Sequence, residues 1–377
     1  MAVGKGPFSR DELLSALQGG DIGGVPASFY ELNPYDENSW YRRNPAYRGL
    51  VEFASERADT FGHSGVGMGT FLSDDSLFER ETVRERVGSS TFITKTIHTP
   101  KGDFVERSRE DDGVHTGWTL DYFLKGEADV ERVLSLPHSP PRLDLSGYWN
   151  VERQLGERGV PIIEIADPIC CLMYMAGFMQ GALWCRTNPE LLIRFVEVMA
   201  ERLSAVVAEI ARQVRRTAFR IVGPEFSAPP LLSAEWFNRL VVPHDARLVR
   251  IIRESDASNV AMIHCHGRLD AVWEGIAAIG PHVLEPLEPP PQGDVEMKEL
   301  RRRAGKDLVL MGYMQFADLE FDTEEETERK VRRAIEDGYR NGGLILIPTA
   351  FPIVTPVAPR CERNLMRFIT TAKEMTV

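Results

Sequence analysis

From about residue 155 onward, short apolar segments rich in β-branched residues alternate with longer segments whose apolar positions recur at helical spacing. The short segments predict strands over 161–165, 219–222, 259–263, 282–284, 308–311 and 344–347. The longer ones predict helices over 188–216, 233–253, 269–278, 294–304, 324–339 and 359–372, with Asn188 and Ser233 as amino-terminal caps. Six strand-then-helix units in series predict parallel strands, because antiparallel neighbours need no helical crossover. The fold class is therefore α/β.

Residues 1–155 are less regular. Helical patterns cover 10–17, 46–57 and 127–136, and residues 90–98 with 103–109 predict a β-hairpin turned at Pro100-Lys101-Gly102. We expect one domain over residues 1–377, a (β/α)8 TIM barrel with an elaborated amino-terminal region. In this hypothesis residues 1–115 cap the barrel and residues 116–377 form most of it. A doubly wound open sheet is the alternative.

Composition and charge narrow the class of protein. With 43% apolar and 27% charged residues, the 377-residue chain has the composition of a globular protein. Its net charge of −12 argues against nucleic acid and anionic membranes as ligands. No stretch reaches the roughly 18 apolar residues of a membrane helix, and residues 1–10 show no secretory signal. Five cysteines, few and odd in number, suit a reducing compartment, so we predict a cytoplasmic protein.

In a barrel of this kind, chemistry is expected at the carboxyl ends of the strands. The strand predicted over 259–263 is followed by His264-Cys265-His266-Gly267. Alternation along an extended chain places His264 and His266 on one side and Cys265 on the other. Two imidazoles and a carboxylate such as Glu288, from the next strand end, would leave positions open on a catalytic metal. A surface salt bridge is the alternative role of Glu288.

Polar residues follow other strands as well. Asp167, Glu225 and Tyr313 stand at or just after predicted strand ends, where they either close loops or position a substrate. The GxGxxG, GxxxxGK[ST], HExxH and GxSxG motifs are absent, which removes the strongest signatures of nucleotide binding, zincin and serine-hydrolase chemistry.

Several stretches, in order, resemble the uroporphyrinogen decarboxylase superfamily from about residue 115 to the end. They are Asp167-Pro168, Asn188-Pro189-Glu190-Leu191, Gly223-Pro224-Glu225, His264-Cys265-His266-Gly267, Glu285-Pro286-Leu287-Glu288-Pro289-Pro290 and Gly342-Gly343-Leu344-Ile345-Leu346. The superfamily includes a cofactor-independent decarboxylase and zinc-dependent, corrinoid-linked methyltransferases. The resemblance therefore implies an enzyme of one of these two kinds.

The two branches differ in motifs that this chain matches incompletely. The Arg-rich amino-terminal signature of the decarboxylase branch is absent, and Tyr41-Arg42-Arg43 is the nearest basic cluster. The methyltransferase branch has His-x-Cys where this chain has His264 and His266, and a second cysteine after the last strand. Here residues 350–355 contain no cysteine and Cys361 comes later. The resemblance implies a metal set of His264, His266, Glu288 and Cys361, with Glu285 as an alternative carboxylate, holding zinc or another divalent metal.

Three hypotheses follow. The first is a metal-dependent methyltransferase-like enzyme in which Glu225, Asp167 and Tyr313 position the substrate. It would move a methyl group between a corrinoid, free or on a partner protein, and a thiol, folate or methoxylated small molecule. The second is a metal-free decarboxylase of a small carboxylic acid or tetrapyrrole, in which the two histidines donate protons and Arg268 binds a carboxylate. The third is a non-catalytic scaffold that binds a corrinoid or tetrapyrrole. The resemblance also implies a homodimer.

Overall fold

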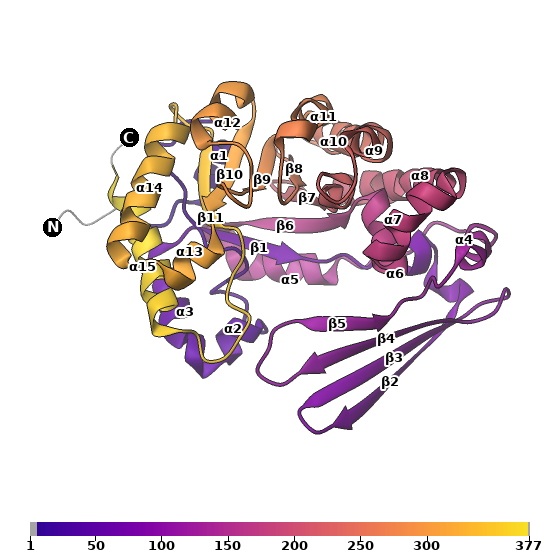
Figure 1. Cartoon of the computed structure of the whole chain (residues 1–377). Coiled ribbons are helices and arrows are strands. Elements are labelled where there is room, and N and C mark those ends of the chain that lie inside the picture. The colour runs from indigo at the N-terminus through magenta and orange to yellow at the C-terminus, as the bar shows by residue number, and fades with distance from the viewer. Residues whose placement is uncertain (1–5, 376–377) are drawn as a thin grey trace.

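A computed structural model describes residues 6–375. Part of residues 1–10, where no secretory signal was found, lies outside this range. Seven parallel strands form a curled sheet with helices on its outside, as in a TIM barrel (Figure 1). In spatial order they are β1 (Thr60–Ser64), β6 (Gly159–Ala166), β7 (Ala218–Val222), β8 (Val260–His264), β9 (Val283–Leu287), β10 (Val309–Met314) and β11 (Leu344–Pro348). The predicted α/β class and all six predicted strands are confirmed.

A short extended segment around Ala27 lies between the two edges of this sheet. On one side, Ser28 N–H donates to the Leu346 carbonyl of β11 (3.0 Å) and Leu346 N–H donates to Pro26 (2.9 Å). On the other, Asp59 N–H, next to β1, donates to the Ala27 carbonyl (2.9 Å). These contacts are isolated parallel bridges rather than a strand. The sheet therefore curls far enough for a few residues to span the distance between its edges.

The longest helix illustrates why the predicted helices form. In α8 (Pro189–Gln213) the Asn188 side chain accepts from Leu191 N–H, and Pro189 occupies the first turn, where its missing N–H costs nothing. Its buried side chains recur at helical spacing and face the sheet. The prediction over 233–253 is wrong in one respect, because the structure has two helices there, α9 (Ala234–Leu240) and α10 (Val242–Ser255). Pro243 lies in the first turn of α10, where it cannot continue a helix from before it.

The other helices lie close to their predicted ranges or in the irregular amino-terminal region, except that the short helix over residues 316–321 was not predicted. They are α1 (Arg10–Leu17), α2 (Trp40–Arg43), α3 (Arg48–Arg57), α4 (Glu127–Leu134), α5 (Ser146–Leu155), α11 (Trp273–Ile279), α12 (Met297–Ala304), α13 (Phe316–Phe321), α14 (Glu324–Gly338) and α15 (Pro359–Glu374). The most apolar stretch forms α6 (Pro168–Ala176) and α7 (Phe178–Thr187), which bend by 110° at Gly177. In residues 6–375 no helix taken singly has the length and apolar character needed to cross a membrane.

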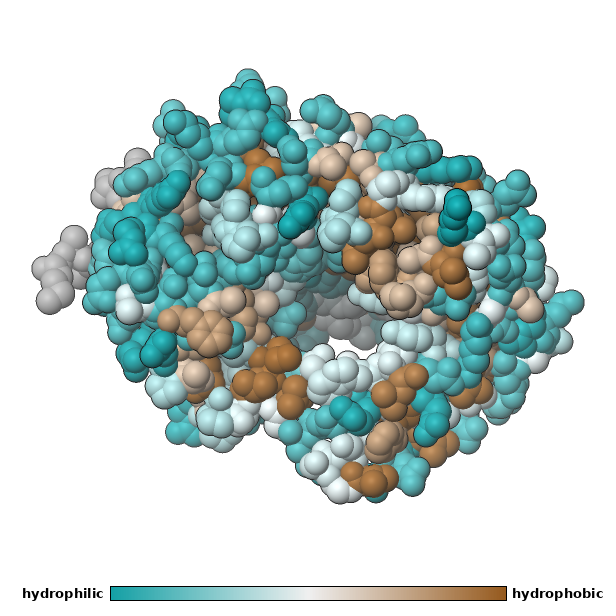
Figure 2. Space-filling view, viewed as in Figure 1, coloured by the Kyte–Doolittle hydropathy of each residue, from teal (hydrophilic) through white to brown (hydrophobic). Residues whose placement is uncertain are grey.

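A four-stranded antiparallel sheet, which we call the arm (residues 79–121), forms a separate layer beside the parallel sheet (Figure 1). Its strands are β2 (Glu79–Val87), β3 (Ser90–His98), β4 (Phe104–Asp111) and β5 (Gly117–Asp121), in that order. The predicted hairpin is β3 and β4, and its position is confirmed. The turn between β4 and β5 meets the loop after β11, where His115 N–H donates to Ile353 (2.7 Å) and Thr355 N–H donates to Gly113 (3.1 Å). The arm is thus attached to the rest of the protein at this turn as well as at its chain ends, and a hollow separates it from the parallel sheet (Figure 2).

The inside of the curled sheet is filled in layers by alternate residues of each strand. One apolar layer consists of Phe61, Ile162, Ala218, Met262 and Val283 from five neighbouring strands. Leu13, Leu14 and Leu17 of α1 belong to the same buried cluster. This layer near the amino-terminal end of the strands is therefore apolar, and the charged layer inside the sheet lies towards their carboxyl ends.

Candidate active site

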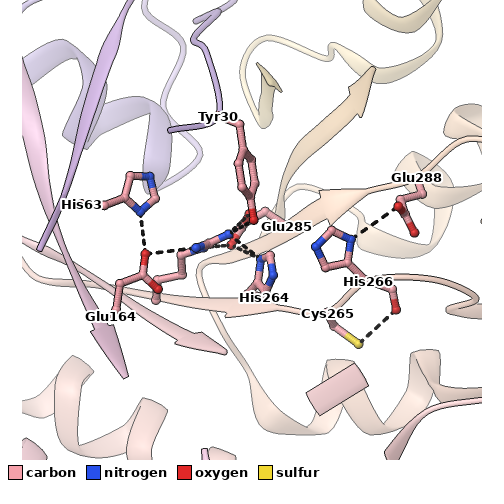
Figure 3. A network of polar contacts seen from close by, with 9 residues as sticks. Tyr30, His63, Glu164, His264, Cys265, His266, Glu285 and Glu288 are labelled. Carbon is pink, nitrogen blue, oxygen red and sulfur yellow. Dashed lines mark hydrogen bonds and ion pairs between the residues drawn. The ribbon is translucent and has the colours of Figure 1, made fainter. Parts of the chain in front are cut away.

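A layer of charged and polar side chains lies directly beyond the apolar layer, two residues further along each strand. It contains His63 of β1, Glu164 of β6, Arg220 of β7, His264 of β8 and Glu285 of β9. Two residues is the repeat of an extended chain, so these side chains point into the sheet as the apolar ones do. Figure 3 shows the labelled members of this layer converging at the carboxyl ends of the strands.

The guanidinium of Arg220 is the centre of the layer. Its Nε donates to Glu285 Oε1 (2.5 Å), its Nη1 to Glu164 Oε1 (3.0 Å) and one Nη2 hydrogen to the Tyr30 hydroxyl (2.5 Å). Nη2 also lies 2.7 Å from His264 Nδ1. The side chains of Arg220 and Glu285 are only 8% and 2% exposed, so the ion pair is almost completely removed from water. One buried cation thus connects two carboxylates, a phenol and an imidazole.

His264 and His266 lie on the same side of the chain, with ring centroids 4.6 Å apart and rings nearly perpendicular. Each imidazole has its own carboxylate: Nδ1 of His264 is 2.9 Å from Glu285 Oε1, and Nδ1 of His266 is 3.4 Å from Glu288 Oε1. Glu288 also accepts from Gly267 N–H (2.7 Å), which fixes its carboxylate beside His266. The side chain of His266 is 36% exposed against 8% for His264. His266 is therefore the histidine that a ligand at the mouth would meet first.

The two histidines have pKa values displaced in opposite directions. Burial, together with the charge of Arg220, lowers the pKa of His264 even though Glu285 opposes the change. Burial would also lower the pKa of His266, but the hydrogen bond and charge of Glu288, helped by the charge of Glu225, outweigh it and raise that pKa. Adjacent groups whose environments separate their pKa values are a pattern typical of acid–base sites. Of the two imidazoles, His266 is therefore the more readily protonated.

The family of this chain follows from its sequence. The sequence profile of uroporphyrinogen decarboxylase (URO-D) matches residues 149–374, more than half of the chain and all of the region from β6 to α15. This chain belongs to the URO-D family. No curated protein sequence matches it significantly.

A solved structure shares the fold of this URO-D protein. A methyltransferase from Methanosarcina mazei superposes with a TM-score of 0.62 at 12% identity, covering 97% of this chain and 99% of that one. A B12-independent methionine synthase from Shewanella sp. W3-18-1 gives a TM-score of 0.39 at 11% identity, covering 70% and 72% of the two chains. At 12% identity the similarity to the Methanosarcina protein concerns the fold alone.

Two acidic residues predicted from sequence lie near the histidines but differ in role. Asp167 is fully buried, and its Oδ1 accepts from Cys170 N–H (2.6 Å) as the cap of α6. Burial and the nearby Asp245 raise its pKa well above the usual range. Glu225, in the turn after β7, lies close enough for its charge to raise the pKa of His266. Of the two, Glu225 is the better placed to act at the mouth.

Two other predicted residues lie elsewhere, and their assignment to the site is corrected. Cys361 is in α15, buried in the core between the helices and the outer face of the sheet. The hydroxyl of Tyr313 accepts from Met297 N–H (2.7 Å) and lies 3.3 Å from Glu296, so it points to the start of α12. Neither side chain contacts the histidines in the described part of the chain. Cys361 lies on a helix behind the sheet, and the positive φ of Tyr313 (69°) breaks the alternation that places Val309 and Met311 of β10 inside the sheet.

The donor set does not fit a metal held by three protein ligands. Within residues 6–375 no three His, Cys, Asp or Glu side chains are grouped so that they could hold a metal ion. Nδ1 of each histidine is engaged by a carboxylate, which leaves one nitrogen on each ring. The Arg220 guanidinium brings a fixed positive charge into the layer at the same depth as His264. We therefore derive no chemical step through a metal.

Sequence reasoning missed Arg220, Glu164, His63 and Tyr30. A signal was present, because Glu164 and Arg220 interrupt the otherwise apolar strands predicted at 161–165 and 219–222. A buried strand seldom carries a charge without a partner. Paired charges at equivalent positions of two neighbouring strands therefore indicate an internal ion pair.

Acid is expected to destabilise the protein through this layer. Burial alone would raise the pKa of Glu285, but Arg220 and His264 outweigh it and hold that pKa well below its usual range. Its contribution to stability is complete above about pH 4.3, the ordinary pKa of a glutamate, and is lost as the pH falls towards its folded-state value. The loss is about 1.4 kcal/mol per pH unit for one carboxylate. Urea unfolding of the wild type between about pH 3 and 7 should show this slope, and Glu285→Gln should reduce it. An unchanged slope in the variant would contradict the assignment.

Proposed function

We propose that this URO-D family protein is a methyl-transfer enzyme that acts on a small molecule bound at the mouth of the sheet, with His266 as proton donor. The observation that carries the proposal is the pair of adjacent imidazoles with opposed pKa shifts, of which His266 is the more exposed. The fold shared with the Methanosarcina methyltransferase agrees with this function. The closed form of the sheet, a full (β/α)8 barrel completed by the segment around Ala27, is part of the same proposal.

Removal of a methyl group from a methoxylated compound explains the need for an acid. As the carbon–oxygen bond breaks, the methyl group goes to an acceptor and the electron pair stays on the oxygen. Protonated His266 gives its proton to that oxygen, so that an alcohol or phenol leaves, and the imidazole becomes neutral. Glu288 stabilises the protonated ring before the transfer. A corrinoid, free or carried by a partner protein, would supply a nucleophile able to accept the methyl group.

Decarboxylation is the second candidate, because the same acid could protonate the carbanion that remains after CO2 leaves. Arg268 is exposed next to His266 and, within the described chain, makes no ion pair, so it is available for a carboxylate. Arg220 is not available in this way, since Glu164 and Glu285 already surround it.

The products distinguish the two functions. Purified full-length protein should be incubated with methoxylated aromatic acids in the presence of reduced cobalamin or of a thiol, and the products analysed by mass spectrometry. We expect a demethylated product and a methylated acceptor, with carboxyl groups intact. Release of CO2 without demethylation would support decarboxylation instead. Binding of cobalamin without turnover of any donor would support a scaffold and overturn both enzymatic proposals.

A further inference from the structure

A groove with a volume of about 490 Å³ lies between α8 and the segment over residues 138–143. Its walls are largely apolar, because Pro140, Pro141 and Leu143 line it from the segment and Val206 lines it from the helix. None of the residues that line the groove belongs to the strands or turns that carry the two histidines. The groove therefore shares no residue with the candidate active site.

Hydrogen bonds hold both walls of the groove to the same turn. On the side of the segment, Asp74 N–H donates to the Ser139 carbonyl (2.9 Å) and Ser139 N–H donates to Ser73 Oγ (3.1 Å). On the side of α8, Nη1 of Arg202 donates to the Phe71 carbonyl (3.0 Å). The groove is thus formed before any ligand arrives, and a ligand would not have to order its walls.

Arg202 brings a positive charge to this groove without a counter-ion. Its side chain is only partly exposed, and burial lowers the pKa of its guanidinium. Within residues 6–375 it makes one hydrogen bond, to the Phe71 carbonyl, and no ion pair. A guanidinium has five N–H donors, and the Nε and Nη2 atoms of Arg202 are not enclosed by protein. Most of its donors are therefore available to a ligand in the groove.

The other titratable side chains of the groove do not neutralise Arg202. Among the described residues that line it, the one acid is Glu209, which pairs with Arg212 and accepts from Gln213 Nε2 (2.9 Å). His138 adds no negative charge, and burial together with the charge of Arg202 lowers its pKa. The groove therefore has a surplus of positive charge in a chain whose net charge is −12.

We propose that this groove binds a small carboxylic acid with an apolar body, whose carboxylate pairs with Arg202 and whose hydrocarbon part lies against Pro140, Pro141 and Val206. The planar N–H donors of a guanidinium match the two oxygens of a carboxylate. Inorganic phosphate would meet the same charge, but the apolar walls offer a strongly hydrated ion nothing in exchange for its water. The site is additional to the proposed function and does not depend on it.

Binding to the wild-type, full-length protein can be measured by isothermal titration calorimetry. Hexanoate should bind at one site per chain, and 1-hexanol, which has the same chain length but no charge, should bind about tenfold more weakly or less. Sodium phosphate should also bind more weakly than hexanoate. Absence of saturable hexanoate binding would overturn the proposal. Equal affinities for hexanoate and 1-hexanol, or for hexanoate and phosphate, would overturn it as well, because each removes one of the two features that define the ligand.

Three variants locate the binding. Arg202→Gln should weaken hexanoate binding by about tenfold or more, because a charge-assisted contact is lost. Arg194→Gln is the matched control, since it removes an arginine from the same helix that pairs with Glu131 outside the groove, and it should bind hexanoate as the wild type does. Ala205→Trp should abolish binding by filling the groove with a large side chain. Binding of wild-type strength in folded Arg202→Gln would contradict the proposal. If Arg202→Gln does not fold, unchanged binding in Ala205→Trp would contradict it instead.

Discussion

His266→Gln is expected to lower kcat of methyl transfer by about 10²–10⁴-fold, the range typical of losing a general acid. Glutamine keeps a similar size and an amide N–H but cannot give up a proton to the leaving oxygen. His98→Gln is the matched control, because His98 has the same kind of carboxylate partner, Asp103 at 3.0 Å, but lies on β3 of the arm. The measurement is kcat for the wild type and both variants, with circular dichroism to confirm folding. Equal kcat values for His266→Gln and His98→Gln would exclude His266 as the acid.

The pH dependence of the same reaction tests the partner of His266. A general acid must be protonated, so kcat should decrease as the pH rises through the pKa of His266. Glu288 raises that pKa, so Glu288→Gln should move the decrease to lower pH. A merely structural effect of Glu288 would lower kcat at every pH without moving the curve. An unmoved curve would therefore contradict the assignment of Glu288 as the group that keeps His266 protonated.

Asp59→Asn is expected to reduce the free energy of unfolding by about 3–5 kcal/mol, as when one partner of a buried ion pair is removed. Asp59 is 1% exposed, and both of its oxygens accept hydrogen bonds. Oδ1 accepts from Phe8 N–H (2.8 Å), and Oδ2 accepts from Ala27 N–H (2.7 Å) and from Lys373 (2.6 Å). Asparagine has one acceptor oxygen in place of two and no charge, so the buried ion pair of Asp59 with Lys373 would be lost. Urea unfolding at neutral pH measures the effect.

Asp112→Asn is the surface control for this experiment. Asp112 is paired with Arg86 on the exposed arm, where both side chains are more than half exposed. Such pairs contribute about 0–1 kcal/mol, so this variant should unfold almost as the wild type does. The double variant Asp59→Asn/Lys373→Met should lose less than the sum of the two single losses, because it removes both charges. Asp59→Asn within 1 kcal/mol of the wild type would show that the buried pair is not important for stability.

Six of the seven parallel strands could be predicted because each of them is largely buried on both faces and reads as an apolar run. The same criterion fails for β2, whose nine residues alternate glutamate and arginine with few apolar side chains and are all exposed. Backbone pairing with β3 holds this strand, together with ion pairs such as Arg86–Asp112. β1 was missed for another reason, since Gly62 suggests a turn. A Cβ at Gly62 would lie 2.7 Å from Leu155, so the glycine is there to let α5 pack closely on the strand.

Only those parts of the candidate site that depend on a single strand, or on the next strand along the chain, could be predicted from the sequence. His264 and His266 share a side because of alternation within a single extended segment, and Glu288 follows from the next strand in the chain. Arg220 could not be connected to His264 in the same way, since their proximity depends on which face of β7 is inside and on how far the sheet curls. The prediction of Cys361 as a metal ligand was wrong because distance along the sequence does not tell on which side of the sheet a helix lies.

The arm has a mechanical consequence. A flap joined to a protein at one end can swing about that end, whereas this sheet is also tied down at the turn between β4 and β5 by the hydrogen bonds of His115 and Thr355. The arm is therefore held in place at both ends, and the hollow between it and the parallel sheet is an opening of fixed width. A molecule that reaches the histidines from this side passes between the arm and the parallel sheet, so the width of that opening limits the size of the molecule.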